Sequence, residues 1–218
     1  MAAVMELGLV LAVSAKAQNA ELTVMATMDP WKAGGYDDGS DGIPPAVFTF
    51  TAGAHQFITF SSVTGSWNCG AGPLYGPDGA DAKANCNGPH YYNDPIGPFA
   101  GIYTTDFYGA LVGMFLEDAL PTSAPTPLRF FVSNNTEGGK STDFRVLVNP
   151  CETLKIGQVF FIGDGLTGTG TGVLQAFFVP PTATHLYLGY PDGSGGIPQG
   201  YSNNIGSLKV VLELHQIH

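Results

Sequence analysis

Short runs of alternating side chains, separated by turn residues, constrain the fold of this chain more than any other feature. Leu22, Val24 and Ala26 occupy alternate positions in residues 21–27, the period of a strand that buries one face. Comparable β-branched or aromatic runs cover residues 46–50, 55–63, 128–133, 144–148, 158–162, 174–179, 184–190 and 206–214. Turn signals such as Asp164-Gly165 and Pro180-Pro181 stand between them, and amphipathic helical spacing is nearly absent. The pattern predicts an all-β fold, a β-sandwich or jelly roll.

The chain of 218 residues is long enough to bury one large core. We expect a single β-sandwich domain over residues 18–218, with long loop insertions at about 80–105 and 114–157. The first of these, rich in Gly, Pro, Asn and Tyr, is of the length that compact domains usually reserve for function.

Residues 1–17 have two readings. Residues 4–15 are mostly apolar, and Ala15-Lys16-Ala17 precedes Gln18 as an A-x-A-like cleavage site, which indicates a signal peptide and a secreted, extracellular protein. The alternative is an ordered N-terminal extension that packs on a neighbouring subunit. No apolar run is long enough for a membrane-spanning helix, so we expect no membrane span.

Charge excludes one large class of partners. The net charge is −10, and only 8 Lys and Arg are dispersed along the chain, whereas nucleic-acid binding needs a basic stripe. An acidic surface instead suits cations and neutral ligands such as carbohydrate or exopolysaccharide.

Two of the three cysteines bracket a loop. Cys69 and Cys86 flank a Gly-, Pro- and Asn-rich stretch, which suits a disulfide in an oxidising compartment and leaves Cys151 unpaired. The alternative is that both are free thiols. No CxxC or paired histidine indicates a zinc site.

The segment from Asp192 to Ser207 carries the clearest chemical signal. Calcium takes six to eight oxygen ligands from carboxylates, amides, carbonyls and water. Asp192, the adjacent Asn203 and Asn204, and a glycine-rich loop that can turn its carbonyls inward supply such oxygens. The segment joins two expected strands, so it would lie at one end of the sandwich. An ordinary polar turn is the alternative, because Asp, Asn and Gly favour turns anyway.

The C-terminal half is similar to the LecA-type calcium-dependent galactophilic lectins. The shared motifs are Gly65-Ser66-Trp67, Gly76-Pro77-Asp78-Gly79, Gly109-Ala110-Leu111-Val112, residues 186–192 and Tyr201 to Ser207. The resemblance implies a galactose-binding-like sandwich that holds Ca²⁺. It assigns as metal ligands Asp192, Asn203, Asn204, the carbonyl of Gly200 and that of Cys69 or Gly70.

The sugar-contacting residues carry over less closely. The family places a His and a Gln three residues apart after the Gly-Pro-x-Gly turn, and here His90 and Asn93 have that spacing in a longer loop. The implied ligand-binding set is therefore His90, Asn93, Asp192 and Asn203, without support for galactose itself. The chain is also longer between Asp192 and Asn203 than the lectin pattern, by an insertion within residues 194–199.

A second resemblance, to secreted bacterial proteins of the PEP-CTERM type, covers nearly the whole chain. Its most specific part is residues 158–170, Gln-Val-Phe-Phe-Ile-Gly-Asp-Gly-Leu-Thr-Gly-Thr-Gly. Those proteins end in a Pro-Glu-Pro tripeptide, an apolar helix and a basic cluster, none of which precedes His218. We therefore expect no anchoring by that route.

The acidic stretch from Asp37 to Asp41 partly matches an EF-hand loop, with Asp37, Gly39 and Asp41 at alternate positions but no glutamate at the twelfth place and no flanking helices. We expect a solvated acidic loop, with a second calcium site as the alternative.

No catalytic motif is present: the sequence has no Gly-x-Ser-x-Gly, HExxH or P-loop. We therefore expect no enzyme. Two hypotheses remain, a calcium-dependent carbohydrate-binding protein and a structural extracellular matrix or filament subunit that self-associates and is stabilised by calcium.

Overall fold

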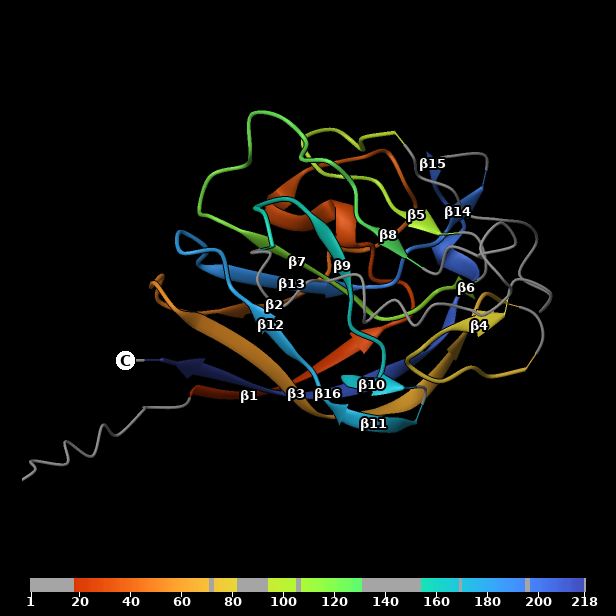
Figure 1. The fold of residues 1–218 in the computed structure, drawn as a ribbon. Coiled ribbons are helices and arrows are strands. Elements are labelled where there is room, and N and C mark those ends of the chain that lie inside the picture. The colour runs from red at the N-terminus through yellow and green to blue at the C-terminus, as the bar shows by residue number, and fades with distance from the viewer. Residues whose placement is uncertain are drawn as a thin grey trace, which may run out of the picture.

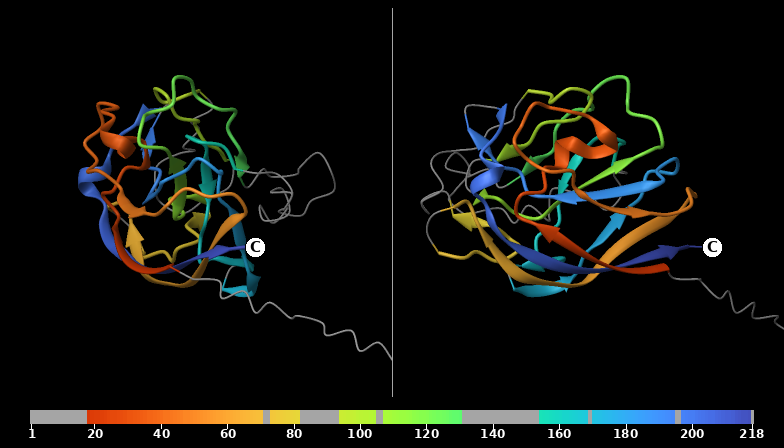
Figure 2. Two further views of the ribbon diagram at one scale, coloured as in Figure 1. Left: turned by 90° about the vertical axis from the view of Figure 1, so that its left-hand side faces the viewer. Right: turned by 180° about the vertical axis from the view of Figure 1, so that it is seen from behind.

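The chain folds as a sandwich of two β-sheets. The computed structural model describes residues 18–70, 73–81, 94–104, 107–130, 154–168, 170–194 and 197–217. The described residues form nearly all-β structure in which two curved sheets face one another (Figures 1 and 2). The predicted all-β sandwich is confirmed.

The first sheet contains four antiparallel strands in the order β1-β16-β3-β12. They are β1 (Gln18–Met25), β16 (Ile205–Gln216), β3 (Gln56–Asn68) and β12 (Ala176–Phe178). β16 lies between the strand that opens the described chain and β3, and it pairs with both along nearly its full length. The alternating burial of β16, with Leu208, Val210 and Leu212 fully buried, shows that this sheet has one core face and one outer face.

The second sheet has the order β2-β13-β7-β9 and is also antiparallel. Its strands are β2 (Ala46–Thr49), β13 (His185–Gly189), β7 (Val112–Leu116) and β9 (Val159–Phe161). Every residue of β7 is buried. Phe115 packs in the cluster between the sheets, whereas Val112 and Met114 pack in a second cluster on the opposite face.

The second cluster lies under the segment that leads to β2. Trp31 and Ala33 of the 3₁₀ helix η1 (Pro30–Gly35) and Phe99 cover the outer face of β7 and β9. Trp31 is fully buried, and its indole N–H donates to the carbonyl of Ala100 at 3.1 Å. β7 and β9 of the second sheet are therefore buried on both faces, in contrast to the strands of the first sheet.

Short elements occupy the connections. They are β4 (Ala80–Asp81) paired with β6 (Phe107–Tyr108), β5 (Tyr103–Thr104) paired with β8 (Arg129–Phe130), the β10–β11 hairpin (Leu166–Gly168 and Thr171–Leu174), the β14–β15 hairpin (Gly193–Ser194 and Ile197–Pro198), and the 3₁₀ helix η3 (Tyr201–Asn203).

The observed strands refine the expected boundaries. The predicted segment 174–179 is divided between β11 and β12, and the insertion expected from residue 114 would begin inside β7, so the irregular stretch starts only after Leu116. The expected strand at residues 144–148 lies outside the described residues.

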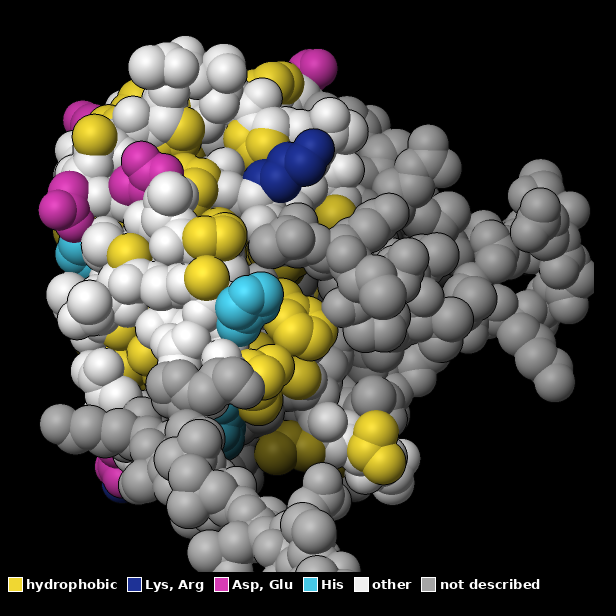
Figure 3. Space-filling view, turned by 60° about the vertical axis from the view of Figure 1, so that its left-hand side comes forward, with side chains coloured by type: hydrophobic (Ala, Val, Ile, Leu, Met, Phe, Trp, Pro, Cys, Tyr) yellow, Lys and Arg dark blue, Asp and Glu magenta, His cyan; other side chains and the backbone are white. Residues whose placement is uncertain are grey.

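One side of the molecule is markedly apolar. Hydrophobic side chains gather around a histidine on the side that lies at the left in Figure 1 (Figure 3). At the end of the first sheet, Phe57 stacks on His215 with ring centroids 4.6 Å apart and lies 6.2 Å from the ring of Phe178. None of the helices in the described part of the chain has the length and apolar character needed to span a bilayer.

Candidate functional site

Three chain segments meet at one end of the sandwich, to the right in Figure 1. β3 ends at Asn68, directly opposite Ile205 at the start of β16, and η3 precedes Ile205. The third segment leaves β13 and reaches Asp192, whose backbone N–H donates to the phenol oxygen of Tyr201 at 3.1 Å. The sheet register thus brings together the three parts of the sequence that were expected to carry metal ligands.

Asp192 is a buried carboxylate next to a buried amide. It is 9% exposed, and one oxygen accepts the Gly193 N–H at 2.7 Å. The Asn204 side chain also hydrogen-bonds the carboxylate. Burial raises the pKa of Asp192 to about 6, because desolvation penalises the charged form more than these hydrogen bonds favour it.

Asn204 has an oxygen without a partner. Asn204 is 6% exposed, and its amide nitrogen donates to the carbonyl of Ala26 at 3.0 Å. The amide oxygen is buried and accepts no hydrogen bond. A buried acceptor left unpaired costs free energy, so its presence beside a buried carboxylate needs an explanation.

Gly200 lies beside Asp192, and Asn203 lies beside Gly70. A Cβ added to Gly200 would be 3.8 Å from an oxygen of Asp192. A Cβ added to Gly70, just after Cys69, would be 3.0 Å from the amide oxygen of Asn203. The close approach at Gly70 shows that the chain beyond β3 touches the Asn203 side chain.

The extra residues between Asp192 and Asn203 form a small projection. β14 and β15 pair with each other, and the Gln199 N–H donates to the Asp192 carbonyl at 3.3 Å. The chain therefore comes back to Asp192 at Gln199, just before Gly200. The insertion leaves Asp192 beside Gly200 and Asn204 and does not separate them.

The acidic stretch is only partly solvated. Asp37 has an 82% exposed side chain, but that of Asp38 is 1% exposed. Asp41 accepts hydrogen bonds from the N–H groups of Tyr201 at 3.0 Å and Ser202 at 3.1 Å. Hydrogen bonds from the Ser202 side chain and these backbone groups lower the pKa of Asp41. Asp37 and Asp41 are exposed, as expected of a solvated loop, but Asp41 also accepts N–H groups of η3, the helix that carries the Asn203 motif.

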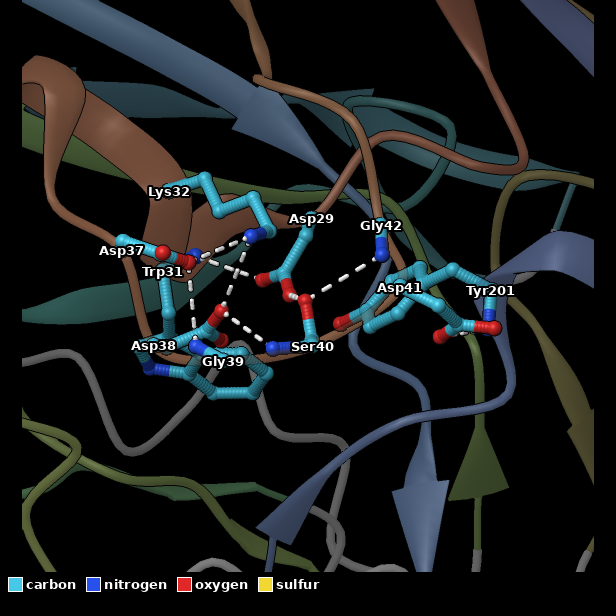
Figure 4. Close-up of polar contacts among 10 residues, drawn as sticks. All are labelled: Asp29, Trp31, Lys32, Asp37, Asp38, Gly39, Ser40, Asp41, Gly42 and Tyr201. Atoms are coloured by element: carbon cyan, nitrogen blue, oxygen red, sulfur yellow. Dashed lines mark hydrogen bonds and ion pairs between the residues drawn. The ribbon is translucent and has the colours of Figure 1, made fainter.

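Asp29 anchors the other end of this stretch (Figure 4). It is fully buried, and its oxygens accept the Trp31 N–H at 2.8 Å and the Ser40 hydroxyl at 2.6 Å. Its carboxyl also contacts that of Asp38, whose other contacts are the Ser40 N–H at 3.0 Å and the Lys32 ammonium at 3.5 Å. Burial, and then the charge of Asp38, raise the pKa of Asp29 to about 7.

The cap by Asp41 leads to a first prediction. Asp41→Ala removes the acceptor of two η3 N–H groups and should lower the free energy of unfolding by about 1 kcal/mol. Asp37→Ala removes the same charge from an exposed position and should change stability much less. Chemical denaturation of both variants measures the difference, and equal midpoints would contradict the capping role.

Several expected residues lie outside the described part of the chain. These are His90, Asn93, Cys86 and Cys151. Cys69 is disulfide-bonded, with its partner outside the described residues, so pairing with Cys86 remains a prediction.

Sequence reasoning missed Asp29 and the hydrogen bonds of Asp41 to η3. For Asp29 a local signal existed: an Asp followed by a proline at the first helical position is a helix N-terminus signature, and Asp29 caps η1. For Asp41 no local signal existed, because its partners lie 160 and 161 residues further along the chain.

Within the described residues no group of three or more His, Cys, Asp and Glu side chains is placed to hold a metal ion. The cluster at Asp192 is of another kind, one carboxylate with amide and carbonyl oxygens. Comparison of the sequence with protein-family models and with curated proteins finds no match.

Proposed function

We propose that this chain is a secreted, non-enzymatic carbohydrate-binding protein that holds one calcium ion at the Asp192 cluster. The observation that carries the proposal is the pair formed by the Asp192 carboxylate and the partnerless Asn204 amide oxygen, both buried at one end of the sandwich.

A cation accounts for both members of the pair. A divalent ion would offset the desolvation of the Asp192 carboxylate, and it would give the Asn204 oxygen the partner that the protein does not provide. Carboxylate, amide and carbonyl oxygens are the ligands that calcium prefers, and the calcium coordination sphere tolerates irregular geometry. Asp192, Asn203, Asn204 and the carbonyls of Gly200 and Cys69 would hold the ion.

The proposed ligands leave room for hydroxyl groups of a sugar. Calcium takes six to eight oxygens, so five protein groups leave positions for hydroxyls in the first coordination shell. Asp192 and Asn203 would also accept or donate hydrogen bonds to such hydroxyls, as the lectin resemblance implies. His90 and Asn93, which lie in the loop expected at about residues 80–105, remain predicted contacts of the sugar.

Removing the only carboxylate of the cluster tests the metal site. At a calcium concentration about a hundred times Kd, the ion should stabilise the native protein by about 2.7 kcal/mol. Asp192→Asn keeps the shape of the side chain and should abolish this stabilisation, because neutral oxygens alone hold a hard cation weakly. Asn204→Ala should weaken it less, because the amide brings no charge. Thermal melting in calcium and in chelator measures each effect.

Asp37→Asn is the matched control for that experiment, since it removes one negative charge at an exposed position outside the cluster. Its calcium-dependent shift should equal that of the unmodified protein. A wild-type melting curve that is the same in calcium and in chelator would reject the metal site. A calcium-loaded protein that binds no sugar on a glycan array would reject the carbohydrate-binding function.

The apolar side of the molecule favours a second candidate, a matrix or filament subunit. The Phe57, Phe178 and His215 cluster lies on the outer part of the first sheet, and Val173 and Leu174 of β11 are 68% and 48% exposed. A subunit that buries these side chains against a copy of itself should form polymers visible by electron microscopy. Sedimentation as a monomer at high protein concentration would contradict this candidate.

A further inference from the structure

A pocket of about 560 Å³ opens beside the Asp192 cluster. Its lining comes from three stretches: residue 36 with 38–41, residues 95–97, and residues 197–200. Gly200 belongs both to this lining and to the proposed metal ligands. The volume falls within the range of roughly 300–1,000 Å³ that is typical of small-molecule sites.

One wall of the pocket is a fixed aromatic ring. A Cβ added to Gly97 would lie 2.2 Å from the Tyr36 ring, so the ring covers the bare backbone there. Phe99 holds the ring from the side, with centroids 5.5 Å apart and planes at 84°. Ile197, 59% exposed, adds an apolar edge from the β14–β15 hairpin.

The polar side chains among the described residues of the lining carry no positive charge. Asp38, Ser40, Asp41 and Gln199 contribute carboxylate, hydroxyl and amide groups, and the described lining contains no Lys, Arg or His. Lys32 of η1, which precedes this loop, already contacts Asp37 at 2.9 Å and Asp38 at 3.5 Å.

We propose that this pocket binds one ring of an uncharged oligosaccharide whose neighbouring ring occupies the calcium cluster. The inference rests on the proposed function and extends it from a sugar ligand to a neutral chain of at least two rings. The apolar face of a pyranose ring packs on Tyr36 and Ile197, while its hydroxyls bond to Ser40, Asp41 and Gln199.

The charge of the pocket sets its specificity. A uronic acid ring would bring a carboxylate next to Asp41, with no cation among the described lining residues to balance it, and like charges at short range disfavour binding. A neutral ring meets no such repulsion. The pocket therefore selects against acidic polysaccharide chains, although calcium itself would tolerate their carboxylates.

Binding of defined saccharides to the calcium-loaded protein tests the proposal. The probes are three monosaccharides (galactose, glucose and N-acetylglucosamine), the neutral disaccharides lactose, cellobiose and N,N′-diacetylchitobiose, and a digalacturonate, each titrated by calorimetry. At least one neutral disaccharide should bind roughly tenfold more tightly than its monosaccharide. The affinity for digalacturonate should be no higher than the affinity for the monosaccharides.

Two variants separate the pocket from the metal site. Ile197→Ala changes an exposed side chain and should remove most of the disaccharide gain, and Tyr36→Ala should remove all of it, while calcium-dependent melting and monosaccharide binding stay unchanged. Val173→Ala, at an equally exposed apolar position on β11, should have no effect. If Tyr36→Ala fails to fold, Ile197→Ala alone carries the test.

The outcomes distinguish the two proposals. Loss of any calcium-dependent shift in the unmodified protein overturns the proposed function. If the calcium shift is normal, three results overturn the pocket proposal. They are no higher affinity for any neutral disaccharide than for its monosaccharide, a higher affinity that Ile197→Ala leaves intact, or tighter binding of digalacturonate than of the neutral disaccharides.

Discussion

Replacing Asp29 with asparagine should weaken the pH dependence of stability between about pH 4 and 7 in calcium-free buffer and leave the smaller part that comes from Asp192, whose pKa is also raised. In the folded chain the pKa of Asp29 is about 7, against an ordinary value of 3.8, so the native state binds a proton that the unfolded state releases. The stabilisation is complete below about pH 3.8 and is lost as the pH rises to about 7. Since each unit of pKa difference corresponds to about 1.4 kcal/mol, the wild-type protein should lose a few kcal/mol over this interval.

Asparagine reproduces the protonated carboxyl. Its oxygen can accept the Trp31 N–H, and its amide group can donate to Ser40 and Asp38 at any pH. Urea denaturation at pH 4.5 and 7.5 measures the effect. Asp37→Asn, which removes the same charge at an exposed position, should keep the wild-type slope. A wild-type protein that becomes more stable over this interval would show that Asp29 is not protonated in the fold.

Gly109→Ala should lower the free energy of unfolding by about 3 kcal/mol or more, the sum of a left-handed backbone cost and overpacking. Gly109 has φ +59°, and a Cβ there would lie 1.8 Å from the Trp67 ring. Trp67 is 2% exposed, packs 5.4 Å from the Tyr190 ring, and donates its indole N–H to the Gly76 carbonyl at 3.2 Å. The indole cannot retreat without breaking these contacts.

Gly35→Ala separates the two costs. Gly35 also has positive φ, +79°, but a Cβ there would meet nothing within 4 Å. This variant should therefore lose only the backbone part, about 1 kcal/mol. Denaturant titration of both variants gives the difference, and equal losses would mean that the Trp67 contact does not limit position 109.

Most of the strands that the sequence predicted bury one face, and β9, which is buried on both faces, was predicted only from its run of β-branched and aromatic residues. β1, β3 and β16 alternate between core and outer side chains, so their period of two is visible in the sequence. β7 was missed as a strand because both of its faces are covered, by the first sheet on one side and by η1 on the other. A strand buried on both faces loses its alternation and reads as a plain apolar run.

The candidate site was predictable to the extent that it is local. Gly200, Asn203 and Asn204 lie close together in the sequence, and Asp192 belongs to the same expected loop between two strands. The contributions of Ala26 and Asp41 were not predictable, since their bonds to this loop span 178 and 160 residues. Such contacts depend on sheet register, which a single sequence does not reveal.

The central position of β16 governs when the chain can fold during synthesis. β1 has no other partner in its sheet, and β3 needs β16 to fill the sheet on that side, so the strand order leaves the first sheet divided until residues 205–216 have been made. The same residues anchor Asn204, which supplies the last part of the Asp192 cluster. A nascent chain therefore cannot complete this sheet before residues 205–216 have left the ribosome, and the slow, non-local step of its folding waits for that strand.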